Sequence, residues 1–340
     1  MTGTTEIETI EHGGALSRAC SRYGGVPGEW LDLSTGINPN PVPLPAISAG
    51  AWARLPDEDL LSSAADTAGI RYGAADGISP LPVAGTQSVI QRLPDIFSGK
   101  VAVIGPTYEE YRVRFERAGR SVDLVPGMDA LSDDYGLVVL VNPNNPDGRT
   151  YSPGDVRTLA RDLSGRGAFL LVDEAFGDLQ PQISVASQAG DVENLVVLRS
   201  FGKFYGLAGL RLGFVLASPA VRSVLENLLG TWPVSGPALE IARHVLADDD
   251  LHRQTIASIG ERSRSLNGIL YEAGLAIAGN TALFSLVEDP RAAKLHDHLC
   301  RHRILTRKFS YMPHWLRFGL CANGDDDERL RVALRAFVDS

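Results

Sequence analysis

The chain has 340 residues, of which 44% are hydrophobic and 21% charged, which is ordinary for a folded protein large enough for two domains that share a core. Its formal net charge of -9 argues against nucleic acid or an anionic membrane as the main partner, although local arginines can still bind small anions. No apolar run approaches the ~20 residues of a membrane span, the polar first residues do not predict a signal peptide, and three distant cysteines predict neither disulfides nor zinc, so we expect a cytoplasmic protein.

The first 50 residues predict an irregular arm, because they are rich in glycine and proline and show little periodicity. A short helix is expected over residues 15–23. The motif His12-Gly13-Gly14 precedes this helix, and a second motif, Leu-Ser-Thr-Gly-Ile-Asn-Pro over residues 33–39, follows it. Such an arm needs another surface to pack against.

Residues 51–231 predict a large α/β domain, because short apolar runs alternate there with longer amphipathic stretches. Each run is apolar throughout, which is typical of strands that are buried on both faces. Amphipathic helices between such strands make βαβ units and a mostly parallel sheet. The runs that predict strands cover residues 101–104, 137–141, 169–172, 195–198 and 214–216.

The segment Trp232–Pro237 interrupts this pattern with prolines and a glycine, and we place a domain boundary there. Residues 232–340 then predict a smaller α+β domain. The elements expected in it are an amphipathic helix that begins near Ala238, a further helix, a strand over 283–287, a helix over 292–301, strands near 304–309 and 315–320, and a final helix over 325–338.

Lys203 is the candidate catalytic residue, because it lies on a glycine-rich loop between two predicted strands. Burial beside these strands and the cation of Arg211, eight residues later, both favour the neutral amine and so lower the pKa of the lysine. A neutral amine is what imine formation with an aldehyde cofactor requires. A solvated loop lysine is the alternative interpretation, and the motifs that precede Lys203 argue against it.

Polar side chains follow the other predicted strands. Asp173, Asn145 and Tyr108 each come shortly after the end of a strand, and in open α/β sheets this edge is where ligands bind. The segment Gly85-Thr86-Gln87 begins a predicted helix, whose first N–H groups can bind a phosphate. Each signal alone is weak, but together they bring a carboxylate, an amide, an aromatic ring, a phosphate site and Lys203 to one edge of one sheet.

With these motifs, the chain resembles the fold-type I pyridoxal-phosphate enzymes of the class I/II aminotransferase superfamily over essentially its whole length. The resemblance implies a mostly parallel, seven-stranded sheet between helices in the large domain, and it implies no metal site. It also implies that Lys203 forms an imine with pyridoxal 5'-phosphate, that Asp173 pairs with the pyridinium nitrogen, and that Asn145 donates to the ring phenolate oxygen. Tyr108 would stack on the ring, and the cofactor phosphate would be held by Gly85, Thr86, Gln87, Ser200 and Arg211.

Three positions depart from the superfamily pattern. Phe176 replaces a tyrosine that is common after Asp-Glu-Ala, so one hydrogen bond to the phenolate oxygen is missing. The segment Ser200-Phe201-Gly202 replaces Ser-x-Ser and loses a hydroxyl near the cofactor phosphate, and Leu55-Pro56-Asp57 replaces a Tyr-Pro-Asp that often reaches the neighbouring subunit's cofactor. These departures weaken individual contacts and leave the cofactor assignment in place.

The arm resembles one branch of the superfamily. His12-Gly13-Gly14 followed by residues 30–39 is similar to the threonine-phosphate decarboxylases of cobalamin biosynthesis, which convert L-threonine O-3-phosphate to (R)-1-aminopropan-2-yl phosphate and carbon dioxide. By this resemblance Arg317 binds the substrate α-carboxylate as a bidentate pair. Arg307, helped by His12, binds the substrate phosphate, and Gly36 belongs to the same substrate site.

Two alternatives remain at this point. A pyridoxal-phosphate-dependent aminotransferase of the histidinol-phosphate type would use the same cofactor and break a different bond at Cα. An inactive binding or regulatory module is disfavoured, because Lys203, Asp173, Asn145 and Arg211 are all present. For either enzyme the resemblance implies a homodimer with its active sites at the subunit interface. The expected partner is a small phosphorylated amino acid, and neither nucleic acid nor a membrane is expected.

Overall fold

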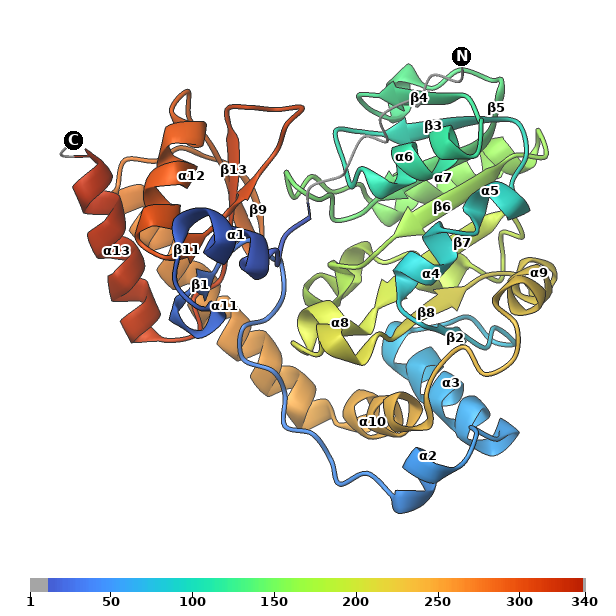
Figure 1. Cartoon of the computed structure of the whole chain (residues 1–340). Helices are drawn as coiled ribbons and strands as arrows, with labels where there is room; N and C mark the ends of the chain where they lie inside the picture. The colour runs from blue at the N-terminus through green and yellow to red at the C-terminus, as the bar shows by residue number, and fades with distance from the viewer. Residues whose placement is uncertain (1–11, 339–340) are drawn as a thin grey trace, which may run out of the picture.

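Two β-sheets organise the computed structural model, which describes residues 12–338 (Figure 1). A seven-stranded sheet forms the larger half and a four-stranded sheet the smaller half, and a separate pair of short strands ties the N-terminal arm to the smaller half. This arrangement confirms the predicted fold class, a mostly parallel α/β sheet with a smaller α+β part. Within residues 12–338, no helix has the length and apolar character needed to cross a membrane.

The large sheet is parallel except at one edge. In spatial order it consists of β2 (Leu81–Val83), β8 (Gly213–Leu216), β7 (Leu195–Ser200), β6 (Phe169–Asp173), β5 (Tyr135–Val141), β3 (Lys100–Ile104) and β4 (Val122–Val125). Strands β7, β6, β5, β3 and β4 run parallel, whereas β8 is antiparallel to both β7 and β2. The apolar runs predicted β3 and β5 to β8, and the two edge strands β2 and β4 are the ones that sequence reasoning missed.

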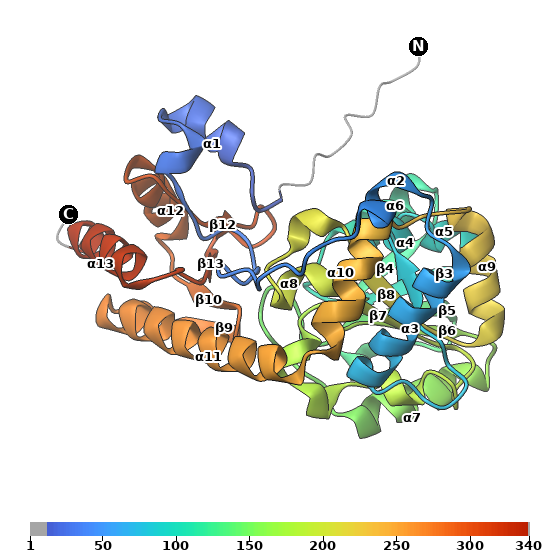
Figure 2. The same ribbon diagram turned by 90° about the horizontal axis from the view of Figure 1, so that it is seen from below.

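Both faces of the large sheet are covered, which explains its uninterrupted apolar strands. One face packs against α3 (Glu58–Tyr72), α7 (Pro153–Ser164) and α10 (Gly236–Ala247), and the other against α4 (Thr86–Ile90), α5 (Leu93–Ile96), α6 (Glu110–Arg117) and α9 (Pro219–Leu229) (Figure 2). Along β5, Val138 and Leu140 face the first group, and Leu137 and Val139 face the second. Full burial of each such side chain contributes about 1.5–3 kcal/mol.

Two of these helices begin at serine caps followed by proline. Ser152 Oγ accepts a hydrogen bond from the backbone N–H of Asp155 (3.1 Å) at the start of α7. Ser235 Oγ accepts one from Ala238 (3.4 Å) at the start of α10. A serine cap satisfies a free N–H of the first turn, and a proline there costs no helical hydrogen bond.

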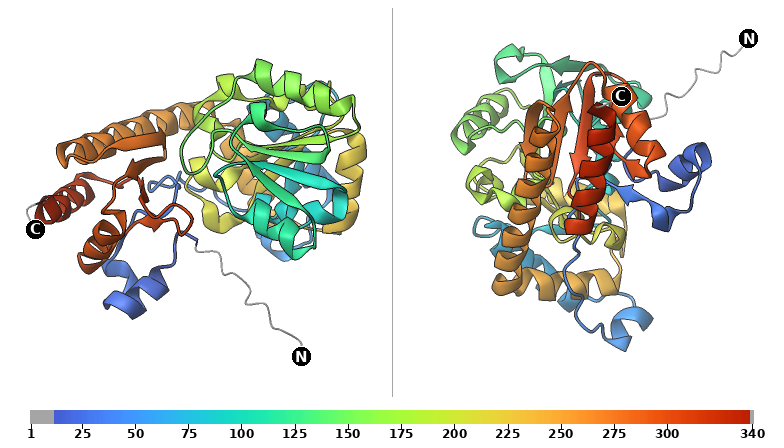
Figure 3. Two further views of the ribbon diagram at one scale, coloured as in Figure 1. Left: turned by 90° about the horizontal axis from the view of Figure 1, so that it is seen from above. Right: turned by 90° about the vertical axis from the view of Figure 1, so that its left-hand side faces the viewer.

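The second sheet is antiparallel. In spatial order it consists of β12 (Arg307–Lys308), β13 (Trp315–Gly319), β10 (Phe284–Glu288) and β9 (Ile277–Thr281), and β9 is the strand that the sequence did not predict. Three helices accompany it, α11 (Asp249–Glu272), α12 (Ala292–Arg301) and α13 (Gly324–Val338) (Figure 3). The helices predicted over 292–301 and 325–338 thus agree with α12 and, within one residue, with α13.

The N-terminal arm connects the two halves. Helix α1 (Leu16–Tyr23) lies against α12, and β1 (Leu31–Asp32) pairs in parallel with β11 (Ile304–Leu305). The chain then reaches α2 (Ala49–Ala53), which packs on α10 beside the large sheet. Helix α10 packs along α3 beside the large sheet, and α11, which follows it in the chain, leads to the second sheet (Figure 1). The division of the chain at residues 50 and 232 stays a prediction.

Candidate active site

Two adjoining cavities lie where the parallel strands of the large sheet end. The smaller has a volume of about 150 Å³ and the larger about 530 Å³, and the larger extends to β12, β13 and the arm. Every residue that the sequence singled out lines at least one of them. The smaller cavity alone is lined by Gly85, Thr86, Asp173 and Ser200, the larger alone by His12, Gly36, Arg307 and Arg317, and both by Gln87, Tyr108, Asn145, Lys203 and Arg211.

Lys203 lies on the short helix α8 (Phe201–Phe204), directly after β7. Burial, followed by the nearby cation of Arg317, lowers the pKa of Lys203 to about 8, and the carboxylate of Asp173 opposes this shift. Its Nζ lies 5.5 Å from the centroid of the Phe176 ring and forms no hydrogen bond within residues 12–338. With this pKa, a larger share of the side chain than in an ordinary lysine is the neutral, nucleophilic amine near neutral pH.

Asp173 ends β6, and its carboxylate is buried, with only 4% of the residue exposed. The Tyr111 hydroxyl donates to its Oδ2 (2.7 Å), and the backbone N–H of Ala175 donates to its Oδ1 (2.9 Å). Burial raises the pKa of Asp173, and the two hydrogen bonds counteract that rise. Because a buried carboxylate is best stabilised by a bonded cation, this position suits a ligand with a protonated ring nitrogen.

Gly85 and Arg211 both adopt backbone conformations that are rare for ordinary residues. Gly85 has φ 73°, which favours glycine, and a Cβ atom there would lie 2.9 Å from Nη2 of Arg211 and push the guanidinium aside. Arg211 itself has φ 55°, and such strain in a residue other than glycine is typical of functional sites. The result is a cation held against the start of α4, where a phosphate can bind.

Arg307 and Arg317 lie directly opposite each other on β12 and β13. Opposed residues of an antiparallel pair share one face of the sheet, and like charges there are destabilising. Burial, followed by the cation of Arg307, lowers the pKa of Arg317 to about 9, so Arg317 remains cationic at neutral pH. Both side chains line the larger cavity. Two cations on one wall suit a ligand with two anionic groups.

Arg317 is oriented by residues from the two other parts of the fold. Its Nη1 donates to Oδ1 of Asn145 on the large half, and its Nη2 donates to the carbonyl oxygen of Ser34 on the arm (3.0 Å). Its buried Nε has no hydrogen-bond partner among the described residues. The two hydrogen bonds therefore fix the guanidinium in place on the wall of the larger cavity.

His12 reaches the larger cavity from the arm, but its Nε2 lies 2.8 Å from Oε1 of Glu110. The other oxygen of Glu110 accepts from Nε2 of Gln87 (2.8 Å), and Oε1 of Gln87 accepts from the Tyr108 hydroxyl (3.1 Å). A chain of polar contacts thus links the arm to Tyr108. A direct role of His12 toward a substrate phosphate stays a prediction.

Sequence reasoning missed four functional candidates. Ser34, Glu110 and Tyr311 line the larger cavity, and the buried Tyr111 lies behind Asp173 and donates to its carboxylate. Glu110 and Tyr111 come two and three residues after Tyr108, at the start of the helix that follows β3, and this position was a signal that could have found them. Ser34 orients Arg317 through its backbone carbonyl, which no side-chain pattern reveals. Tyr311 lies in the loop between β12 and β13, whose conformation the sequence does not determine.

Phe176 forms part of the wall of the smaller cavity beside Lys203. Its ring meets Phe284 edge to face, with the centroids 5.1 Å apart. A Cβ atom on Gly36 would lie 2.9 Å from Cε1 of Phe176, so glycine lets the arm close onto this ring. The contact explains why a glycine is found at this point of the arm.

Comparisons with known proteins identify relatives of this chain in sequence and in fold. Residues 64–337 match the family model of aminotransferase class I and II. Threonine-phosphate decarboxylase from Sinorhizobium sp is 52% identical over 96% of this chain and 97% of its own length, and the enzyme of that name from Pseudomonas aeruginosa is 42% identical over 97% and 98%. The histidinol-phosphate aminotransferase from Sinorhizobium meliloti, solved in complex with pyridoxal-5'-phosphate, shares the fold with a TM-score of 0.78 at 18% identity, covering 100% of this chain and 98% of its own.

Proposed function

The chain belongs to the aminotransferase class I and II family, and from this premise we propose that it decarboxylates L-threonine O-3-phosphate with pyridoxal 5'-phosphate as cofactor. The products are carbon dioxide and (R)-1-aminopropan-2-yl phosphate, a building block of cobalamin biosynthesis. Near full-length similarity to two threonine-phosphate decarboxylases supports the choice of reaction. The observation that carries the proposal is the opposed pair Arg307 and Arg317 on the wall of the larger cavity.

The two arginines match the charges of this substrate. Threonine phosphate carries a carboxylate and a phosphate of about -1.5 to -2 charge at neutral pH, and one guanidinium cannot bind both groups in a bidentate manner. Arg317, fixed by Asn145 at the boundary of the smaller cavity, suits the α-carboxylate. Arg307, on the neighbouring strand, suits the phosphate.

The residues of the smaller cavity fit pyridoxal 5'-phosphate. The buried carboxylate of Asp173 would bind the ring nitrogen, and Asn145 would bind the ring oxygen. The space that Gly85 leaves beside Arg211 would take the phosphate, together with Thr86, Gln87 and Ser200, while Tyr108 would cover the ring. When bound, the cofactor accepts the electrons of a bond that breaks at the substrate Cα.

The protein's own residues would decide which bond breaks. Arg307 and Arg317 would hold the two anionic ends of the substrate and so set which bond at Cα is turned toward the bound cofactor. Lys203 Nζ, with a pKa of about 8, can hold and release a proton near neutral pH. It can therefore deliver the proton that replaces the lost carboxyl group at Cα.

Carbon dioxide release tests the proposal. Purified holoenzyme should release carbon dioxide from L-threonine O-3-phosphate in the absence of any keto acid, with one amine product formed per carbon dioxide. The alternative, an aminotransferase of the histidinol-phosphate type, would form no carbon dioxide and would consume 2-oxoglutarate. A dependence of turnover on 2-oxoglutarate would decide for that alternative.

We also propose that the chain forms a homodimer. Trp52, Leu55 and Trp232 are exposed by 71%, 64% and 53%, which is unusual for large apolar side chains. They belong to one region, because α2 packs on α10, which begins just after Trp232. Sedimentation velocity should give a dimer, and Trp52→Glu should shift it toward monomer. A fully active monomer would contradict the proposal.

A further inference from the structure

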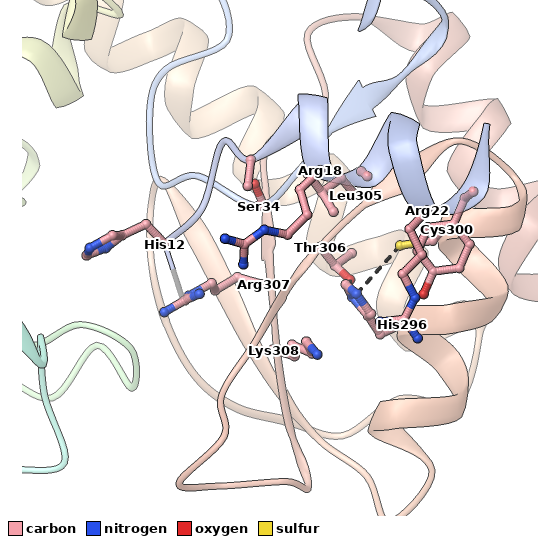
Figure 4. Close-up of a pocket in the computed structure, with 13 residues that line it drawn as sticks. His12, Arg18, Arg22, Ser34, His296, Cys300, Leu305, Thr306, Arg307 and Lys308 are labelled. Carbon is pink, nitrogen blue, oxygen red and sulfur yellow. Dashed lines mark hydrogen bonds between the residues drawn. The ribbon is translucent and has the colours of Figure 1, made fainter. Parts of the chain in front are cut away.

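A third cavity, of about 90 Å³, lies between α1 and the strands β11 and β12 (Figure 4). It shares His12, Ser34 and Arg307 with the larger cavity. No aspartate or glutamate stands among the described residues that line it. Arg18, Arg307 and Lys308 are cations on this wall, and the charge of a fourth cation, Arg22, is offset by Asp297 behind it. A concave surface that carries one sign of charge concentrates ions of the opposite sign. The third cavity is therefore suited to an anion.

Arg18 and Arg307 approach the junction of the third and larger cavities from different elements. Arg18 extends from α1 and Arg307 from β12, and their guanidinium groups point toward the side where His12 lies (Figure 4). The Arg18 side chain has no hydrogen-bond or ion-pair partner within residues 12–338. Its charge is thus available to a ligand at the junction.

We propose that Arg18 binds the phosphate of the substrate together with Arg307 and makes the enzyme selective for phosphorylated substrates. This inference rests on the proposed function and adds to it a residue that sets specificity. Two guanidinium groups match the charge of a phosphate, and each can form paired hydrogen bonds with its oxygens. Arg317 is then left for the carboxylate.

Arg22 provides a matched control on the same helix. Its Nη2 lies 3.7 Å from Oδ1 of Asp297, and its guanidinium lies over the Tyr23 ring, 5.1 Å from the centroid. In Figure 4 it lies near Cys300, at the end of the third cavity that is remote from His12. Arg22→Ala therefore removes the same charge from the same helix without reaching the junction.

The test compares holoenzymes carrying Arg18→Ala, Arg18→Lys and Arg22→Ala. One measurement is kcat/KM for L-threonine O-3-phosphate, and the other is the dissociation constant of inorganic phosphate by titration calorimetry. In the holoenzyme the bound cofactor fills its own phosphate site, so added phosphate reports on the substrate site. Arg18→Ala should lower kcat/KM about tenfold, mainly through KM, and weaken phosphate binding by a similar factor.

Arg18→Lys and Arg22→Ala serve as controls for geometry and for charge. Arg18→Lys should recover part of the loss, because it keeps the charge and loses the bidentate geometry. Arg22→Ala should change both quantities by less than about twofold. Unchanged phosphate binding in Arg18→Ala, or equal losses in Arg18→Ala and Arg22→Ala, would overturn the assignment of Arg18.

A failure of the proposed function would look different. If the wild-type enzyme released no carbon dioxide from threonine phosphate, the proposed reaction would be wrong, while phosphate titration would still decide the role of Arg18. Weaker phosphate binding in Arg18→Ala, with Arg22→Ala like the wild type, would uphold the assignment for another phosphorylated substrate. A wild-type enzyme that bound no phosphate would overturn it.

Discussion

Replacing Arg307 by alanine should separate the two anionic contacts of the substrate. The substitution removes one charge-assisted contact, which contributes roughly 1.5–3 kcal/mol and corresponds to about a ten- to hundredfold loss in kcat/KM. The other contact survives, because the cation of Arg307 lowers the pKa of Arg317 and its removal can only raise that pKa. Arg317 also keeps its bonds to Asn145 and Ser34.

The assay is carbon dioxide release from L-threonine O-3-phosphate and from unphosphorylated L-threonine. Arg307→Ala should harm the phosphorylated substrate ten- to hundredfold by the same roughly 1.5–3 kcal/mol and leave threonine nearly unaffected, whereas Arg317→Ala should harm both. Arg301→Ala, on the exposed end of α12, controls for the loss of a positive charge from this half of the molecule. Equal losses for both substrates in Arg307→Ala would refute the phosphate role and favour the aminotransferase alternative.

Three further predictions concern Lys203, Tyr111 and Phe176, which lie in or beside the smaller cavity. Lys203→Met should abolish activity and the visible absorbance of bound cofactor, yet stabilise the cofactor-free protein by about 3 kcal/mol at pH 7, because folding lowers the lysine pKa from 10.5 to about 8. This gain in stability is complete below pH 8 and vanishes as the pH rises to 10.5. Urea unfolding measures it, and equal stabilities of the wild type and Lys203→Met at pH 7 would contradict the burial of the ammonium. Tyr111→Phe should raise the pKa of Asp173, whose hydrogen bond from Tyr111 lowers it, and should weaken cofactor binding about tenfold in a titration of the cofactor-free protein; unchanged affinity would show that Asp173 does not meet the ring nitrogen. Phe176→Tyr adds a hydrogen-bond donor beside Lys203 that would stabilise the deprotonated ring oxygen of the cofactor. The pKa of the imine nitrogen between Lys203 and the cofactor, measured from the visible absorbance band, should therefore fall. An unchanged or higher pKa would show that residue 176 does not face this oxygen.

The sequence predicted the part of the fold that burial determines. Strands β3 and β5 to β8 are covered on both faces or lie near the centre of the sheet, and their side chains are apolar without interruption. The strands that it missed are short or lie at an edge. In β4, at the edge of the large sheet, Leu124 is exposed by 57% and the preceding residue is Asp123, so no apolar run marks it.

The residues of the candidate site likewise fall into those that the sequence could reveal and those that it could not. Asp173 and Asn145 could be found because parallel strands bring their carboxyl ends to one edge, which is a property of the topology. The opposition of Arg307 and Arg317 could not be found, because a shift of one residue in the register would turn one of them to the other face. The contact of His12 with Glu110 joins segments that are far apart in the chain, and no local pattern encodes it.

The two cavities also differ in the origin of their walls, and this bears on how one fold can serve different reactions. The smaller cavity is built from residues 85–212, which belong to one sheet and the loops at its edge. The larger cavity needs the arm and the pair β12–β13 as well, and Arg317 on β13 contacts the arm through Ser34 and the loop after β5 through Asn145. Small changes in the arm or in β12–β13 can therefore rotate a substrate over an unchanged cofactor site. We accordingly expect the choice between decarboxylation and amino transfer to depend on the arm and on Arg307, and the cofactor residues to be shared by both kinds of enzyme.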